Sequence, residues 1–166
     1  MSQLEHRLDA IEYSGAARLH AIIQKPAVGV HVRVDRADVV EGLGLEGDHR
    51  KKDWWKGERI PEREVTAISK EIMEVLETAV DVPGDNLVLE GVDLRALKPG
   101  CLLRVGPSVV LQRAQKTHRP CDLFARRISE EARKAVAQCE LRGALFSVVH
   151  GGTLSLGDSI IIESQS

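Results

Sequence analysis

One cysteine stands where thiol chemistry is favoured. Cys121 follows Pro120 in the stretch THRPCDLFARR, at a predicted helix start. Proline fits the first turn of a helix, so the thiol would lie near the positive end of the helix dipole. The helix start and nearby cations both lower a thiol pKa, which favours a nucleophile or a ligand for a soft metal. Free cysteine is also often buried, so a core role is the alternative. The neighbouring basic residues are Lys116, Arg119, Arg126 and Arg127, with His118 beside them.

The other two cysteines lack this setting. Cys101 opens the apolar run CLLRV and is expected in the core, whereas the pattern around Cys139 assigns it no role. Three cysteines far apart in sequence argue against a disulfide framework and for a reducing compartment. The first fifteen residues show no apolar signal segment, and no apolar run is long enough for a membrane span. We therefore expect a cytoplasmic protein without membrane contact. The net charge of -2 argues against a nucleic-acid partner.

The chain has 166 residues, which suggests one domain. Residues 1–16 are predicted to be an extension with a short helix, and residues 17–166 a single domain. Apolar residues alternate along several short segments that come in neighbouring pairs, with a break expected at Lys25-Pro26. Residues 69–79 are predicted to be a helix with Ser69 as its N-cap, and residues 120–139 are predicted to be helical in two pieces. This pattern predicts a mainly β fold, an antiparallel β-barrel or sandwich with two or three peripheral helices.

A long polar segment interrupts the strands between residues 41 and 62. Its glycines resemble a phosphate loop in composition but not in spacing, which favours turns that need positive φ. Asp48 and His49 are either a polar site edge or a solvated turn. Trp54 and Trp55 are adjacent in so polar a segment that they cannot both be core, so one is expected at a pocket or partner surface. A segment of this length marks a functional or mobile loop.

An ordered set of motifs gives a family resemblance. GLEGDH, REVTAI, GDNLVLEGVDL, CLLRVG, RPC, RGA and GGTLSLGD follow one another from about residue 18 to residue 163. The set resembles the MOSC domain family, which includes the C-terminal domains of molybdenum cofactor sulfurases, the amidoxime-reducing component proteins and small bacterial stand-alone proteins. The resemblance implies a β-barrel and a role around the molybdenum cofactor (molybdopterin). It also implies that Cys121, the cysteine of the PC motif, carries sulfur as a persulfide or ligates molybdenum.

The resemblance extends to further site residues. The family's Gly-Asp falls on Gly47 and Asp48, its arginine before the Val-Thr strand on Arg63, and its Gly-x-Asn on Gly84 and Asn86. Basic groups that would suit a pterin phosphate are Arg63, Lys116, Arg119 and Arg126. The predicted metal ligand is Cys121. The predicted cofactor-binding residues are Gly47, Asp48, Arg63, Asn86, Lys116 and Arg119.

This sequence also departs from the family pattern. It has a long charged insert at residues 51–61, and Ala144 stands where many relatives have a second glycine after Arg142. Both differences bear on the shape of the site entrance. No pyridoxal-phosphate domain accompanies the motifs, so no pyridoxal phosphate is expected in this chain, which could not mobilise cysteine sulfur alone.

Three functions follow as hypotheses. In the first, Cys121 is a molybdenum ligand or sulfur relay, and the protein reduces a small N-hydroxylated substrate with electrons from a partner protein, since the chain has no haem, flavin or iron–sulfur signature. In the second, it is a non-catalytic carrier that takes sulfur from a donor protein or hands on the cofactor. In the third, it is a barrel that binds a small molecule or a protein through residues 51–61. We further expect residues 48–62 to form one wall of a cleft at Cys121, with Trp54 or Trp55 at its rim.

Overall fold

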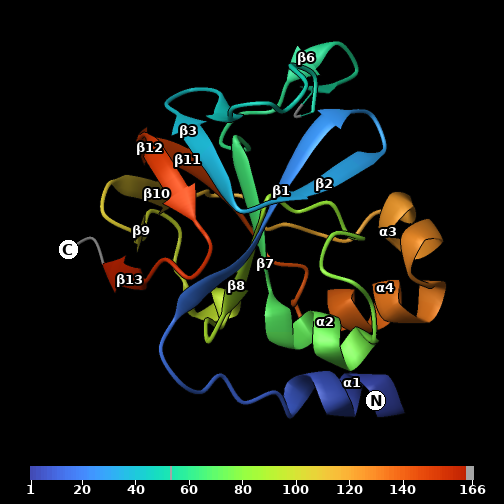
Figure 1. Ribbon diagram of the computed structural model, residues 1–166. Coiled ribbons are helices and arrows are strands. Elements are labelled where there is room, and N and C mark those ends of the chain that lie inside the picture. Colours follow the sequence, from blue (N-terminus) through green and yellow to red (C-terminus); the bar gives the residue numbers. More distant parts are fainter. Residues whose placement is uncertain (53, 164–166) are drawn as a thin grey trace.

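The fold is built around one large sheet. A computed structural model describes residues 1–52 and 54–163; Asp53 of the predicted loop and residues 164–166 of the predicted domain lie outside the described residues. Eight strands form a single mixed sheet (Figure 1). Their spatial order is β13 (Ile160–Glu163), β9 (Leu102–Val105), β10 (Val109–Arg113), β11 (Ala144–His150), β7 (Val65–Ser69), β8 (Leu87–Glu90), β1 (Arg18–Ala27) and β2 (Val30–Val34).

Two smaller sheets and the helices complete the architecture. The smaller sheets are β12 (Gly152–Ser155), β3 (Arg36–Val40) and β4 (Gly44–Leu45), and the hairpin of β5 (Trp54–Trp55) and β6 (Glu58–Arg59). The helices are α1 (Gln3–Asp9), α2 (Lys70–Leu76), α3 (Asp122–Arg127) and α4 (Glu130–Gln138), with a 3-10 turn, η1 (Leu94–Ala96). Figure 1 shows the four α-helices gathered on one side of the large sheet. The predicted mainly β fold with peripheral helices is therefore confirmed.

The predicted closed barrel is not confirmed. The described strands pair in antiparallel ladders, except that β7 and β8 are parallel and are joined through α2. β1 changes its pairing partner along its length. Its first half pairs with β8, and its second half pairs with β2. The start of β1 instead meets the segment before β13 at an isolated bridge between Arg18 and Ser159. The result is a curled sheet whose edge strands β13 and β2 are not joined in a ladder.

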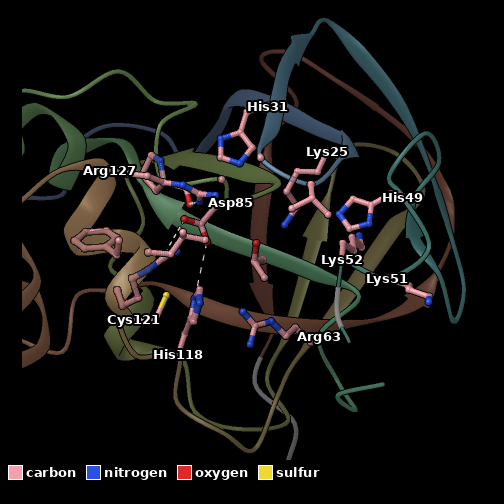
Figure 2. Close-up of a pocket in the computed structure, with 18 of the residues that line it drawn as sticks. Lys25, His31, His49, Lys51, Lys52, Arg63, Asp85, His118, Cys121 and Arg127 are labelled. Carbon is pink, nitrogen blue, oxygen red and sulfur yellow. Dashed lines mark hydrogen bonds and ion pairs between the residues drawn. The ribbon is translucent and has the colours of Figure 1, made fainter. Parts of the chain in front are cut away.

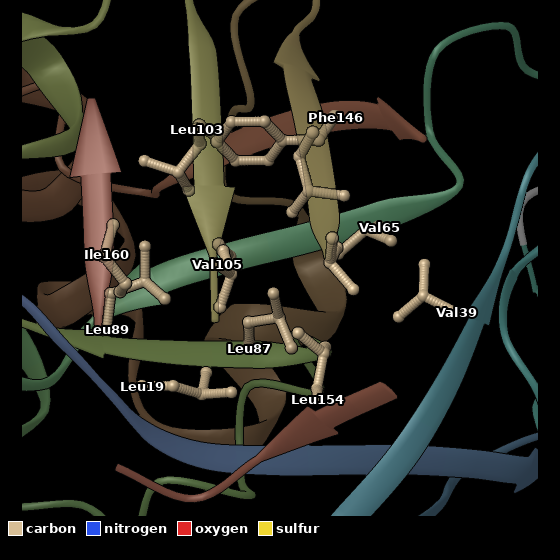
Figure 3. Close-up of a cluster of buried hydrophobic side chains, with 14 of the residues drawn as sticks. Leu19, Val39, Val65, Leu87, Leu89, Leu103, Val105, Phe146, Leu154 and Ile160 are labelled. Carbon is tan, nitrogen blue, oxygen red and sulfur yellow. The ribbon is translucent and has the colours of Figure 1, made fainter. Parts of the chain in front are cut away.

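The central strands are buried on both faces. One face packs against the three-stranded sheet and forms an apolar cluster with it (Figure 3). The cluster includes Leu19, Val39, Val65, Leu87, Leu89, Leu103, Val105, Phe146, Leu154 and Ile160. The other face packs against the helices through side chains such as Ile23, Ile68 and Val88. Strands that are covered on both faces read as continuous apolar runs, which explains LVL in β8 and the fully buried VTAIS of β7.

Two predicted element boundaries are wrong. β1 continues through Pro26 to Ala27, so there is no break at Lys25-Pro26. Pro26 lies within a register shift of the β1–β2 ladder, where its missing N–H breaks no regular pairing. The helix predicted over residues 69–79 ends at Leu76, since Glu77 adopts the left-handed conformation. Ser69 does occupy the N-cap position, but its hydroxyl donates to the carbonyl of Val92 (2.6 Å) and caps nothing.

The Ser69 hydroxyl gives a first prediction. Ser69→Ala is expected to lower the free energy of unfolding by about 1–2 kcal/mol, because it leaves the buried Val92 carbonyl without its partner. Urea unfolding followed by circular dichroism measures the change. Ser14→Ala, at an exposed position, is the matched control and is expected to change stability by less than about 0.5 kcal/mol. Equal effects of the two substitutions would contradict the assignment.

Candidate functional site

Cys121 opens onto a strongly cationic pocket of about 340 Å³ (Figure 2). The cysteine is exposed and is the N-cap residue of α3, where it has extended backbone angles. Asp85 is the single carboxylate among the described residues that line the pocket. Such a surplus of positive charge indicates an anionic ligand. The lining cations are Lys25, Lys51, Lys52, Arg63, Arg119, Arg127 and Arg142.

A buried ion pair lies behind the thiol. Asp85 is fully buried, and its Oδ2 accepts a hydrogen bond from Arg142 Nη1 at 2.6 Å. The Arg142 guanidinium lies over the Phe124 ring, 5.1 Å from its centre, so it is held on two sides. Asp85 Oδ1 and His118 Nδ1 face each other at 3.9 Å, and neither atom has a hydrogen-bond partner in the described part of the chain. Buried polar atoms normally have a hydrogen-bond partner, so these two atoms need an explanation.

Two histidines line the pocket in their neutral form. Burial, followed by the charge of Arg142, holds the pKa of His118 well below its ordinary value. The pKa of His31 is also lowered, chiefly by burial. The ring of His31 places Nδ1 2.7 Å from the Asp81 carbonyl, so in the neutral ring Nδ1 carries the proton and Nε2 is left as an acceptor. The ring packs closely on Gly84, where a Cβ would lie 2.7 Å from His31 Nε2. Glycine is therefore required at that position.

A second buried network fixes the neighbouring wall. The side chain of Asp48 is 2% exposed, and its carboxylate accepts from the Lys25 backbone N–H at 2.7 Å. It also accepts from Lys52 Nζ at 2.6 Å and from Asn86 Nδ2 at 2.8 Å. Asn86 in turn contacts Thr66 and Ile23, so the network ties the loop after β4 to the centre of the sheet. Asp48 and Asn86 position the wall, and the Lys52 side chain lines the pocket in front of them.

Lys25 is the most perturbed cation of the pocket. Burial first, and the charge of Lys52 second, lower the pKa of its amine to about 8. The pKa of this lysine would otherwise be near 10.5. Lys25 is thus partly neutral in the slightly alkaline range, and a bound anion would favour its charged form.

The titration of Lys25 can be measured directly. Its acetylation by acetic anhydride, followed by peptide mass mapping, is expected to rise with an apparent pKa of about 8. Exposed Lys98 is the control for reaction with the reagent. Folding lowers this pKa, so the charged form of Lys25 lowers the free energy of unfolding at all pH values below about 8. The free energy of unfolding then rises between about pH 8 and pH 10.5, where Lys25 is neutral in the folded protein but still charged in the unfolded chain. A Lys25 profile that matches Lys98 would contradict the assigned burial.

The predicted site residues separate into three groups. Three residues that were predicted to bind the metal or the cofactor line the cationic pocket: Cys121, Arg63 and Arg119. Asp48 and Asn86 lie behind its wall, and Gly47 lines a neighbouring pocket. Lys116 and Arg126 do not line the cationic pocket; the Lys116 backbone carbonyl accepts from the buried Arg113 side chain.

The predicted loop is only partly a wall of this pocket. His49, Lys51 and Lys52 line it, whereas Trp54 lines the neighbouring pocket and the tryptophans belong to the β5–β6 hairpin. The departure at Ala144 does not reshape the entrance, because Ala144 is fully buried in β11, in the sheet core. Gly143 beside it has φ +109, and a Cβ there would lie 2.0 Å from the Ala67 carbonyl.

Several pocket residues were not predicted from the sequence. Asp85 had a signal, since it lies inside the GDN motif, and His118 lies beside Cys121 in the sequence but is buried. Arg142 also lies in a noted motif. Lys25 and His31 carried no signal, because they lie in what reads as an ordinary pair of strands. No group of three or more His, Cys, Asp or Glu side chains in residues 1–52 and 54–163 is arranged to hold a metal ion. The helices of these same residues include none that is long and apolar enough to cross a membrane.

Comparison with known proteins identifies the family and similar folds. Residues 59–161 match the MOSC domain family model. Among solved structures, the YuaD protein from Bacillus subtilis shares 20% identity with a TM-score of 0.73, covering 92% of this chain and 98% of that protein. YiiM from Geobacillus stearothermophilus shares 18% identity with a TM-score of 0.65, covering 89% of this chain and 75% of that one. YiiM from Escherichia coli shares 20% identity with a TM-score of 0.64, covering 90% and 71%. No curated protein matches the chain.

Proposed function

Because the chain belongs to the MOSC domain family, we propose that it binds the molybdenum cofactor in the pocket at Cys121. The observation that carries the proposal is an exposed thiol at the rim of a pocket lined by seven Lys and Arg side chains and one carboxylate. A thiolate is a ligand for a soft metal, and clustered cations suit a phosphate group.

The pocket residues fit such a group. Asp85 is paired with Arg142 and Asp48 with Lys52, while Arg119 and Arg127 add positive charge that would suit an anion from outside the chain. Arg119 and Arg127 would hold the phosphate end, and Cys121 would meet the metal. The acceptor nitrogen of His31 offers a polar partner to a heterocycle. When bound, the cofactor supplies the oxidation–reduction chemistry that these side chains lack.

The proposed activity is the reduction of small N-hydroxylated compounds with electrons from a partner protein. The chain's own part is to orient and to supply a proton. The Lys25 amine, with a pKa of about 8, holds a proton near neutral pH and can release it inside the pocket.

A second candidate is a sulfur carrier without catalysis. The exposure of Cys121 favours it, because a sulfur carried as a persulfide must reach the active site of another protein. The two functions use the same thiol and differ in whether substrate turns over.

Metal analysis tests the proposal. The protein and a Cys121→Ser variant are purified from a host that makes the cofactor, and molybdenum is measured per chain. We expect molybdenum near one per chain in the unchanged protein and strong depletion in the variant. Cys101→Ser is the matched control and should retain the metal, since Cys101 is buried in the core. A reductase assay with an added chemical electron donor then separates the enzyme from the carrier. Protein that holds no molybdenum would overturn the cofactor proposal.

A further inference from the structure

A second and larger pocket lies beside the first. It has a volume of about 660 Å³ and is framed by the turn between β3 and β4, the loop that follows β4 and the β5–β6 hairpin. The Arg59 guanidinium of β6 donates to the Gly42 carbonyl, which fastens the hairpin to the turn. The buried Asp48–Lys52 pair fixes the loop between them. All three walls of the pocket are thus held by hydrogen bonds, and its volume is in the range of small-molecule sites.

The pocket presents apolar surface to solvent. Trp54 is 42% exposed and Leu43 is 63% exposed, and both line it together with Val40 and Leu45. Lys51 Nζ lies over the Trp54 ring, 5.9 Å from its centre, which restrains the indole. A fixed indole beside exposed aliphatic side chains is suited to stack on a flat ring.

The charges of the lining restrict the ligand further. Among the lining residues, Arg50, Lys52 and Arg59 carry positive charge, and Glu46 and Asp48 carry negative charge. Lys52 and Asp48 neutralise each other in their buried pair. Arg50 is exposed and stands on the same wall as that pair. Glu46 opposes a polyanion, whereas the exposed Arg50 guanidinium can pair with a single negative charge.

We propose that this pocket is a binding site for a planar aromatic monoanion, such as an aromatic carboxylate, with Trp54 stacked on the ring and Arg50 paired with the anionic group. The site does not depend on the molybdenum cofactor. It is separate from the Cys121 pocket, although His49 and Lys52 line both.

Two fluorescent probes that differ by one charged group test the proposal. They are 8-anilinonaphthalene-1-sulfonate, an aromatic monoanion, and its neutral parent N-phenyl-1-naphthylamine, each excited directly and titrated with the full-length protein. We expect saturable binding of one sulfonate probe per chain, weaker binding of the neutral probe, and displacement of the sulfonate by 2-naphthoate.

Variants locate the binding. Trp54→Ala and Arg50→Gln are each expected to weaken the sulfonate probe by about 5-fold or more. Trp55→Ala is the matched control: this side chain is 67% exposed and does not line the pocket, so affinity should stay within about 2-fold. Circular dichroism establishes that each variant is folded. The proposal is overturned by the absence of saturable binding, by equal affinity for the neutral probe, or by a loss in Trp55→Ala as large as that in Trp54→Ala.

Discussion

Iodoacetamide is expected to alkylate Cys121 of the native protein about 100-fold faster than Cys139. Cys121 is exposed, whereas Cys139 is buried against α1, and burial raises the pKa of the Cys139 thiol to about 11 from an ordinary 9.0. A rise of this size lowers the reactive thiolate about 100-fold in the neutral pH range. Cys101 should also be slow, because it is buried and burial raises its pKa.

The alkylation experiment carries its own control. Peptide mass mapping at increasing times gives the three rates in one sample. In urea the three thiols should react at similar rates, which shows that the native difference arises from the fold. A native Cys121 that reacts no faster than Cys139 would remove the accessible thiol on which both the cofactor-ligand and the sulfur-carrier proposals depend.

Asp48→Ala is expected to destabilise the protein by about 3–5 kcal/mol. The substitution leaves the Lys52 ammonium, on a side chain that is 5% exposed, without its counter-charge. It also removes the acceptor for the Lys25 backbone N–H and for Asn86. A loss of this size is a large part of the total stability of a domain, so the variant is expected to populate unfolded chains at moderate temperature.

Two companion variants identify the cause. Asp38→Ala removes an exposed carboxylate that bonds Thr153 at the surface, and it should cost about 1 kcal/mol or less. Asp48→Leu combined with Lys52→Met removes both charges, and it is expected to be more stable than Asp48→Ala because no buried charge remains unpaired. Urea unfolding of the four proteins measures the differences. If the double variant is no better than Asp48→Ala, the unpaired lysine is not the source of the loss.

Strand-forming segments could be predicted because their apolar runs are long and are bounded by glycine or proline. The β8 segment LVLE and the β11 segment ALFSVVH are examples. The closure of the sheet could not be predicted, because it depends on which partner each half of β1 selects, and both halves are equally apolar in sequence. The strand boundary at Pro26 was wrongly predicted for a different reason. A proline breaks a strand only where a backbone N–H is needed for pairing, and Pro26 lies in a register shift where none is needed.

The site was predicted where a residue carries its own chemical signal. A cysteine after a proline and amid arginines is such a signal, whereas Arg63 was predicted from the family resemblance. Lys25 is different, because a lysine in a strand is normally an exposed cation. The pKa of its amine is lowered first by burial under segments distant in sequence and then by the charge of Lys52. The roles of Asp48 and Asn86 were also hidden, since the same polar residues can face a ligand or hold a wall, and the choice depends on which way the side chain points.

The cationic pocket is assembled from parts of the chain that are synthesised at very different times. Lys25 belongs to β1, Lys52 to the loop after β4, Asp85 to the segment before β8, and Arg142 to the turn before β11. On the ribosome, the early residues must wait for Arg142 before Asp85 gains its partner and the pocket closes around Cys121. A ligand of this pocket would therefore meet the complete set of lining residues only after Arg142 has been synthesised.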